Sequence, residues 1–216
     1  MTPGPTGTVE AVSVTWAVKA DLPTDTTGID KREVPVVTLT PAGVEGDRVQ
    51  DTRHHGGRDK AVYAYAGEDA DHWAAELGRD VPPGWFGDNL RLRGVAVSEA
   101  LIGERWRLGD DVLVEVTQPR VPCMTFQRHV DEPRWVKRFA QANRVGAYLR
   151  VLQPGQVRAG DAVRVMHRPA HGVSAARWFG EQDPADARRL LDAQERDGLE
   201  LAPSLLAYVE RALTRA

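Results

Sequence analysis

The sequence predicts a mainly β protein with α-helices: a β-barrel-like domain followed by a small three-helix extension. Short runs of alternating apolar residues recur through residues 1–167 and are separated by turns that contain Gly or Pro. Repeated short strands of this kind favour a barrel or sandwich. After His167 the strand pattern stops and helix signals replace it.

The strand signals follow one another along residues 1–167. Val12, Val14, Trp16 and Val18 alternate with small residues, which is the period of a strand. The further expected strands span residues 34–40, 60–66, 111–117, 147–152 and 162–166. Turns at Leu108-Gly109-Asp110 and Ala159-Gly160-Asp161 separate some of them.

Two helices are expected to interrupt these strands. Apolar residues with helical spacing occur at Ala70, Trp73, Ala74 and Leu77. Gly78 is a suitable helix stop, because glycine adopts the left-handed conformation that ends many helices. A second helix is expected around Trp135 and Phe139, just after Pro133.

Residues 168–216 are expected to form the extension, with residues 168–172 as a linker. Ser174 can cap a helix that runs through Phe179, and Asp183-Pro184 and Pro203 begin two more. Three short helices bury too little core to be stable alone, so we expect them to dock on the β domain, with Trp178 and Phe179 as anchors. A cap over a barrel edge is favoured over a lid or a docking surface for a reductase.

The composition is that of an ordinary globular protein. It is 42% hydrophobic and 27% charged, which excludes a mostly disordered chain. Lys and Arg number 28 and Asp and Glu 31, a net charge of −3, so no nucleic-acid or anionic-membrane partner is indicated. No apolar run is long enough to cross a membrane, and residues 1–8 do not resemble a secretory signal. We therefore expect a cytoplasmic protein.

Three segments carry residues suited to chemistry. Residues 43–65 combine the basic Arg48, Arg53, Arg58 and Lys60 with His54-His55-Gly56-Gly57. Adjacent glycines can turn backbone N–H groups towards a ligand, and nearby cations suit a phosphate. A solvated turn is the plainer interpretation and is favoured on these residues alone. Zinc binding by the two histidines is disfavoured, because neighbouring side chains on a strand point apart.

The other two segments are shorter. Gly84-Trp85-Phe86-Gly87-Asp88-Asn89-Leu90 contains an amide, Asn89, that could bind a planar heterocycle, although a simple turn is favoured. Arg120-Val121-Pro122-Cys123 places the single cysteine after an expected strand. One cysteine excludes an internal disulfide, and a nearby arginine favours the thiolate form. A reactive thiol and a buried small side chain are about equally supported.

Taken in order, these segments resemble the MOSC family, named after the C-terminal domain of molybdenum-cofactor sulfurases, and within it the YiiM-like branch. The resemblance lies in Gly46-Asp47-Arg48, in His55-Gly56-Gly57 with Asp59-Lys60-Ala61-Val62-Tyr63, and in the two motifs just described. Residues 168–213 resemble the helical extension of that branch. The branch usually has Glu where this chain has Asp88, whose reach is one methylene shorter.

The resemblance implies a MOSC β-barrel-like fold and a molybdenum cofactor, a molybdopterin, with Cys123 as the protein ligand to molybdenum. It makes seven residues candidates for the pterin and phosphate pocket: Arg48, His55, Gly56, Gly57, Lys60, Asn89 and Arg120. It also implies reduction of small N-hydroxylated compounds, including hydroxylamino-purines, with electrons from an external flavin or ferredoxin-type reductase. Asp88 or a histidine near the pocket is the candidate proton donor. No pyridoxal phosphate site is expected.

Two other functions remain open at this point. The protein could carry or insert the cofactor without catalysing a reaction. Alternatively, Cys123 could carry a persulfide and transfer sulfur, which would not need bound molybdenum.

Overall fold

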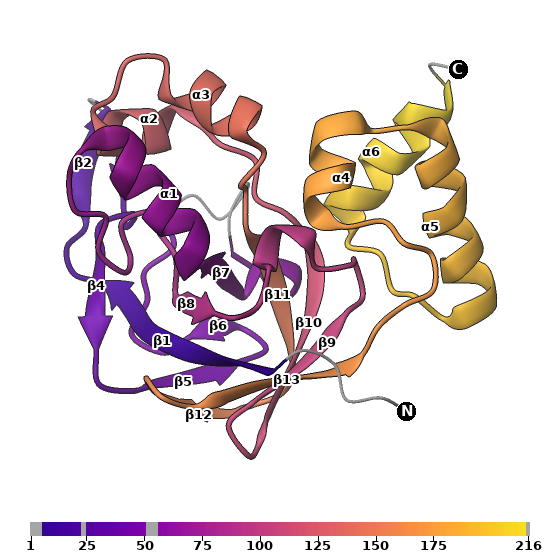
Figure 1. Cartoon of the computed structure of the whole chain (residues 1–216), viewed down its shortest axis with the longest axis horizontal. Coiled ribbons are helices and arrows are strands. Elements are labelled where there is room, and N and C mark those ends of the chain that lie inside the picture. Colours follow the sequence, from indigo (N-terminus) through magenta and orange to yellow (C-terminus); the bar gives the residue numbers. More distant parts are fainter. Residues whose placement is uncertain (1–5, 23–24, 51–55, 215–216) are drawn as a thin grey trace.

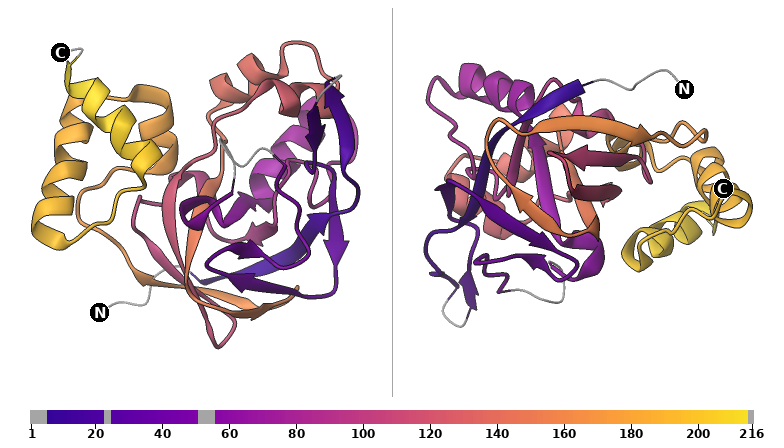
Figure 2. Two further views of the ribbon diagram at one scale, coloured as in Figure 1. Left: turned by 180° about the vertical axis from the view of Figure 1, so that it is seen from behind. Right: turned by 90° about the horizontal axis from the view of Figure 1, so that it is seen from below.

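The structure, a computed structural model, describes residues 6–22, 25–50 and 56–214. Its centre is a closed barrel of seven strands in the order β13-β9-β10-β11-β7-β8-β1, and pairing of β1 with β13 completes the ring (Figures 1 and 2). Within it, β7 and β8 are parallel and the other neighbours antiparallel. The barrel strands are β1 (Thr6–Thr15), β7 (Val62–Ala66), β8 (Leu90–Arg93), β9 (Arg105–Leu108), β10 (Val112–Pro119), β11 (Ala147–Gln153) and β13 (Ala162–His167).

Shorter strands surround the barrel. β4 (Lys31–Val34) pairs with β1, and two small sheets contain β2 (Lys19–Leu22) with β3 (Asp25–Thr27), and β12 (Gly155–Val157) with β5 (Val37–Thr40) and β6 (Gly43–Val44). The helices are α1 (Gly67–Leu77), α2 (Met124–Val130), α3 (Trp135–Ala142), α4 (Ala175–Glu181), α5 (Pro184–Asp197) and α6 (Pro203–Thr214), with short 3-10 turns η1 (Arg58–Lys60) and η2 (Val97–Glu99).

Alternation along the strands separates two cores. On β7, Val62 and Ala64 belong to the barrel core, whereas Tyr63 and Tyr65 belong to a second cluster outside the barrel. This second cluster, here called the aromatic cluster, consists of Tyr63, Tyr65, Ala70, Trp73, Phe86, Phe126, Val130, Trp135, Phe139, Val145 and Tyr148. It joins β7 and β11 to α1, α2 and α3, so those helices cover one side of the barrel (Figure 1). A strand with a period of two can supply both cores at once.

The helices α4, α5 and α6 form a separate lobe beside the barrel (Figures 1 and 2). They share an apolar core in which Trp178 and the barrel-side Ile102 are both buried. Phe179 packs against the aromatic cluster, and Ser204 Oγ donates to Gln118 Oε1 on β10 at 2.9 Å. The expected docking of the extension, with Trp178 and Phe179 as anchors, is confirmed.

The predicted fold class is confirmed, and so are several of the local signals. Ser174 accepts a hydrogen bond from the Arg177 N–H, Asp183 accepts from Ala185 N–H, and Gly78 ends α1 in the left-handed conformation. The division into a domain of residues 1–167 and one of residues 168–216 stays a prediction. In the described part of the chain, no helix has the length and apolar character needed to span a membrane.

Two expectations about elements were wrong, and one helix was missed. Residues 34–40 do not form one strand: β4 ends at Val34 and β5 begins at Val37, because Pro35 has no N–H for a sheet hydrogen bond. β1 ends at Thr15 instead of continuing to Val18. The helix α2, directly after Cys123, was not predicted, because its apolar residues Phe126 and Val130 become evident as a buried face only against the aromatic cluster.

His171 connects the start of the extension to the barrel. Its Nε2 lies 2.8 Å from the Ile102 carbonyl oxygen, and its Nδ1 accepts from the Val173 N–H at 3.0 Å. Both contacts are satisfied together only when the ring is neutral and carries its proton on Nε2. Burial lowers the pKa of His171, while the hydrogen bond to Ile102 opposes this effect.

A lowered pKa in the folded state makes His171 contribute stability above the unfolded-state pKa of about 6.5 and lose it as the pH falls. We predict that the Tm decreases between pH 7.5 and 5.5, and that His171→Gln makes this decrease shallower. Thermal unfolding followed by circular dichroism measures it. Val121→Ala, which shortens an exposed side chain that does not titrate, is the control and should keep the wild-type slope. Equal slopes in wild type and His171→Gln would contradict the prediction.

Candidate functional site

The Gly46-Asp47-Arg48 turn is tied to the barrel by one buried carboxylate. Asp47 Oδ1 accepts hydrogen bonds from the Thr15 N–H at 2.9 Å and the Thr15 hydroxyl at 2.7 Å. Its Oδ2 lies 2.6 Å from Lys31 Nζ and accepts from Asn89 Nδ2 at 2.9 Å. Burial by itself would raise the pKa of Asp47, but Lys31, Thr15 and Asn89 together hold it below its ordinary value.

Asn89 carries this network into β7. Its Nδ2 also donates to the Ser13 carbonyl at 3.2 Å, and its Oδ1 accepts from the Tyr63 N–H at 3.2 Å. The side chain is buried and its amide is engaged by the protein itself. Asn89 therefore joins two of the motifs, and its binding to a cofactor, expected from the sequence, stays a prediction that this geometry does not favour.

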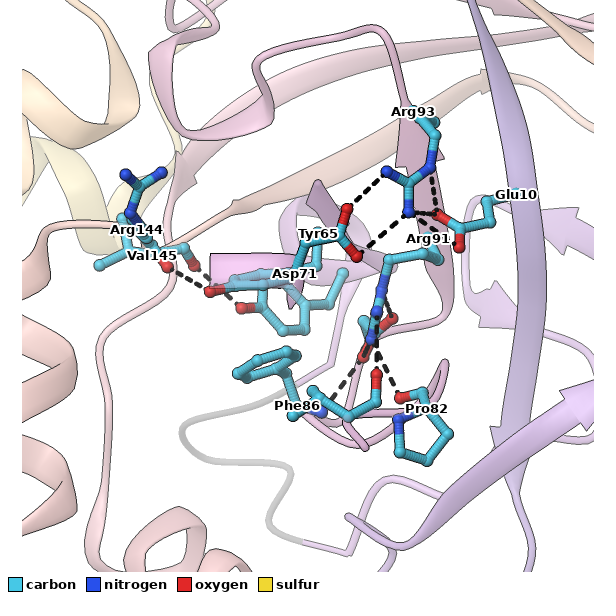
Figure 3. Close-up of polar contacts among 12 residues, drawn as sticks. Glu10, Tyr65, Asp71, Pro82, Phe86, Arg91, Arg93, Arg144 and Val145 are labelled. Atoms are coloured by element: carbon cyan, nitrogen blue, oxygen red, sulfur yellow. Dashed lines mark hydrogen bonds and ion pairs between the residues drawn. The ribbon is translucent and has the colours of Figure 1, made fainter. Parts of the chain in front are cut away.

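Asp88 is also buried, with none of its surface exposed. Its Oδ2 accepts from Arg91 Nε at 3.1 Å, and its Oδ1 accepts from the Phe86 N–H at 3.2 Å. Arg91 in turn donates to the Pro82 carbonyl at 3.1 Å (Figure 3). The structure thus places Asp88 in an internal ion pair that shapes the Gly84–Gly87 turn. The role of Asp88 as a proton donor stays a prediction that its burial and its pairing with Arg91 do not favour.

The glycine-containing loop leads into η1. Gly56 and Gly57 have φ angles of +74° and +78°, which a side chain would strain. The following Lys60 places its Nζ 5.9 Å from the centroid of the Tyr148 ring on β11. Arg48 is exposed, and its N–H donates to Thr15 Oγ1 at 3.1 Å. The candidate His55, with His54, lies outside the described residues.

Arg120 is the most informative member of the predicted set. The residue is 3% exposed, and its guanidinium lies 4.2 Å from the Phe126 ring centroid and 5.3 Å from that of Tyr63. Its Nη1 is buried without a hydrogen-bond partner in the described part of the chain. An unpaired buried donor of a charged group is costly, so the position suits a hydrogen-bond acceptor supplied by a ligand.

Cys123 lies at the start of α2, half-buried against the aromatic cluster. Its neighbours Val121 and Met124 are each 54% exposed. Burial raises the pKa of Tyr148, Arg120 lowers it, and the charge of Cys123 raises it. The Tyr148 ring lies 5.3 Å from the Tyr63 ring, which Arg120 covers, and Lys60 reaches Tyr148 from η1. Cys123 packs against the aromatic cluster to which both tyrosines belong.

These residues fit a molybdenum cofactor of the pterin type. The thiol offers a soft ligand, the unpaired guanidinium N–H and Lys60 offer cationic donors, and Gly56 and Gly57 allow close approach of the backbone. Among the residues that the structure describes, no group of three or more His, Cys, Asp or Glu side chains could hold a metal ion.

Comparison with known proteins agrees with this geometry. The MOSC domain model matches residues 51–164. This chain belongs to the MOSC family. It is 31% identical over 163 residues to the protein YiiM of Escherichia coli (strain K12), with 72% of each chain covered. The crystal structure of YiiM from Geobacillus stearothermophilus superposes with a TM-score of 0.76 at 26% identity, covering 96% of this chain and 99% of that one.

A second relative is named for an activity. A reductase of Gibberella moniliformis (strain M3125 / FGSC 7600) is 34% identical over 140 residues, which is 62% of this chain and only 24% of that protein. The chain thus spans about a quarter of this relative. Membership of the MOSC family, YiiM and this reductase together support a role associated with the molybdenum cofactor.

Tyr148 is the residue of the site that sequence reasoning missed. Its signal was present, because it alternates with the core residues Ala147 and Leu149 and therefore had to point out of the barrel. Its place near the start of the Arg120–Cys123 segment follows from the pairing of Tyr148 with Gln118 on β10, two residues before Arg120 in the chain.

Removing the Asp47 carboxylate should destabilise the fold strongly. Asp47→Ala leaves Lys31, whose side chain is 10% exposed, without its partner. We expect a loss of about 3–5 kcal/mol in the free energy of unfolding, measured by urea denaturation. The control Asp71→Ala removes a surface carboxylate that is 65% exposed and pairs with Arg93 (Figure 3), and it should cost less than about 1 kcal/mol. Similar losses for both variants would show that Asp47 is not a structural centre.

Proposed function

We propose that this protein is a molybdenum-cofactor-dependent oxidoreductase that reduces N-hydroxylated compounds of the hydroxylamino-purine type with electrons from an external reductase. The observation that carries the proposal is a half-buried thiol, Cys123, three residues after Arg120, whose buried guanidinium has no hydrogen-bond partner for Nη1 among the described residues. The family and the reductase relative support the same chemistry.

Each residue of the site has a defined task in this proposal. Cys123 supplies the sulfur ligand to molybdenum. Arg120 would donate from Nη1, which has no partner among the described residues, to an anionic or carbonyl oxygen of the cofactor, and Lys60 would add a second positive charge. When bound, the cofactor supplies the two-electron chemistry that breaks the N–O bond, while the protein orients the reactants.

Tyr148 replaces Asp88 as the proton-bearing candidate. Because burial raises its pKa above the ordinary value, its hydroxyl stays protonated at neutral pH. A protonated hydroxyl in the aromatic cluster against which Cys123 packs can hold a proton at Oη for the oxygen or nitrogen atom that becomes basic when the N–O bond breaks.

The surroundings of Cys123 support a flat, partly apolar substrate. The exposed side chains of Val121 and Met124 stand on either side of the thiol in the sequence and offer apolar contact to a heterocyclic base. Electrons are assigned to a separate flavin or ferredoxin-type reductase.

The proposal predicts that Cys123 is required for metal retention. Protein made in a host that synthesises molybdopterin should contain close to one molybdenum atom per chain by elemental analysis, and Cys123→Ala should lose at least about tenfold of it. Reduction of N-hydroxylaminopurine with a chemical electron donor should fall in parallel. The loss is expected because Cys123 is the only cysteine of the chain, so the variant has no thiolate to bind molybdenum.

Val121→Ala is the control for local perturbation, since it shortens an exposed neighbour and should keep the metal. Full turnover by loaded Cys123→Ala protein would refute the proposal. Bound molybdenum without turnover of any N-hydroxylated substrate would instead assign the protein a carrier function.

A further inference from the structure

The loop between α5 and α6 aims one carboxylate back at the barrel. Leu201 and Ala202 in this loop are buried in the core of the extension. The neighbouring Glu200 is left out of that core, and its side chain is 56% exposed. Because its neighbours are held by apolar packing, the loop presents Glu200 at a defined place.

Glu200 binds two arginines that belong to the barrel side of the molecule. Arg58 donates to both carboxylate oxygens, with its Nη2 3.0 Å from Oε2. Arg150 Nη1 lies 2.7 Å from the same Oε2, and Arg150 Nη2 donates to the Glu200 backbone carbonyl at 2.8 Å. The hydrogen bond from Arg58, with help from Arg150, holds the pKa of Glu200 below its ordinary value, so the carboxylate is charged at neutral pH.

Arg150 also connects Glu200 to the turn η1, which contains Arg58, through an ion pair with Asp59. It is fully buried on β11, and its Nη2 lies 3.1 Å from Asp59 Oδ1. The Asp59 backbone carbonyl also accepts from Thr117 Oγ1 on β10 at 2.6 Å. The turn η1, residues Arg58–Lys60, is therefore held from the barrel through Asp59 and from the extension through Arg58.

The turn η1 contains or adjoins two candidate cofactor-binding residues, Lys60 and Gly57, so the contact of Glu200 with Arg58 bears on the site. Lys60 is its last residue and reaches the Tyr148 ring, and Gly57 is its first flanking residue, whose carbonyl accepts from the Lys60 N–H at 3.1 Å. A shift of η1 would move the Lys60 ammonium and the glycine N–H groups together. Docking of the extension alone does not require this contact, because Ser204 and Gln118 already join the two parts elsewhere.

We propose that Glu200 is a positioning residue for the cofactor-binding loop: the extension, through Glu200, holds the turn Arg58–Lys60 in the geometry that retains the cofactor. This inference rests on the proposed function, since it concerns the same site. It gives the extension a task beyond covering the barrel edge. The Glu200–Arg58 pair is about half exposed, so its contribution to global stability is small, and Arg150 keeps Asp59 and Glu115 as partners when Glu200 loses its charge. The main effect of that loss should therefore be on the turn η1.

The first test uses the whole chain without cofactor, made in a host that cannot synthesise molybdopterin. In hydrogen–deuterium exchange, Glu200→Gln should speed exchange of the Lys60 amide by about fivefold, while amides of β10 and β11 exchange as in wild type. Glu181→Gln is the matched control: it makes the same chemical change on the extension at a carboxylate that meets only Arg177 among its described contacts. It should leave the Lys60 amide unchanged.

The second test uses protein loaded in a competent host. The rate of molybdenum loss during dilution should rise by about fivefold in Glu200→Gln and stay at the wild-type value in Glu181→Gln and Ser204→Ala. If Glu200→Gln exchanges the Lys60 amide and loses molybdenum at the same rates as the wild type, the inference is overturned and the proposed function stays intact. Wild-type protein that loads no molybdenum would overturn the proposed function and the retention step, and the exchange experiment would still decide whether Glu200 holds the turn.

Discussion

The Asp47 carboxylate is the interaction on which the arrangement of the site depends most. It accepts hydrogen bonds from Thr15 on β1 and from Asn89, and it pairs with Lys31 on β4. Asn89 then continues to the backbone of Tyr63 on β7. A buried charge is stable only when its hydrogen-bond and ion-pair partners are present, because these interactions offset the free-energy cost of removing it from water. This requirement fixes the loop that follows β6 against the barrel and sets the direction from which the chain enters the glycine-containing segment.

The outward faces of β7 and β11 explain why the site lies where it does. Inside the barrel these strands contribute small and aliphatic side chains, while Tyr63 and Tyr148 point outward, and Arg120 lies over the Tyr63 ring. Arg120 also lies over the Phe126 ring, and its Nη1 has no hydrogen-bond partner among the residues that the structure describes. The same cluster supports α2, whose first turn follows Cys123. The aromatic cluster thus holds both the guanidinium of Arg120 and the thiol of Cys123 at the outer surface of the barrel.

The extension is joined to this region by electrostatics as well as by apolar packing. Arg150 is a fully buried cation that meets Glu115 on β10, Asp59 in η1 and Glu200 in the extension. Three carboxylates from three parts of the chain compensate its charge, so none of these parts can move without weakening the others. The barrel, the turn and the extension therefore form a mechanically connected unit around the site.

The sequence by itself determined the elements whose signals are local. Strand alternation, the caps at Ser174 and Asp183, and the motif order that indicates the family all depend on residues a few positions apart. It also predicted Arg120 and Cys123 as residues of the site. The tertiary structure alone decided that Asp88 is enclosed in an ion pair and that Tyr148 lies between Lys60 and Tyr63. It alone brought Glu200 to Arg58 across a separation of 142 residues. Segments distant in the sequence determine how exposed a charged side chain is and which groups it pairs with. The residues next to it in the sequence therefore do not predict either property.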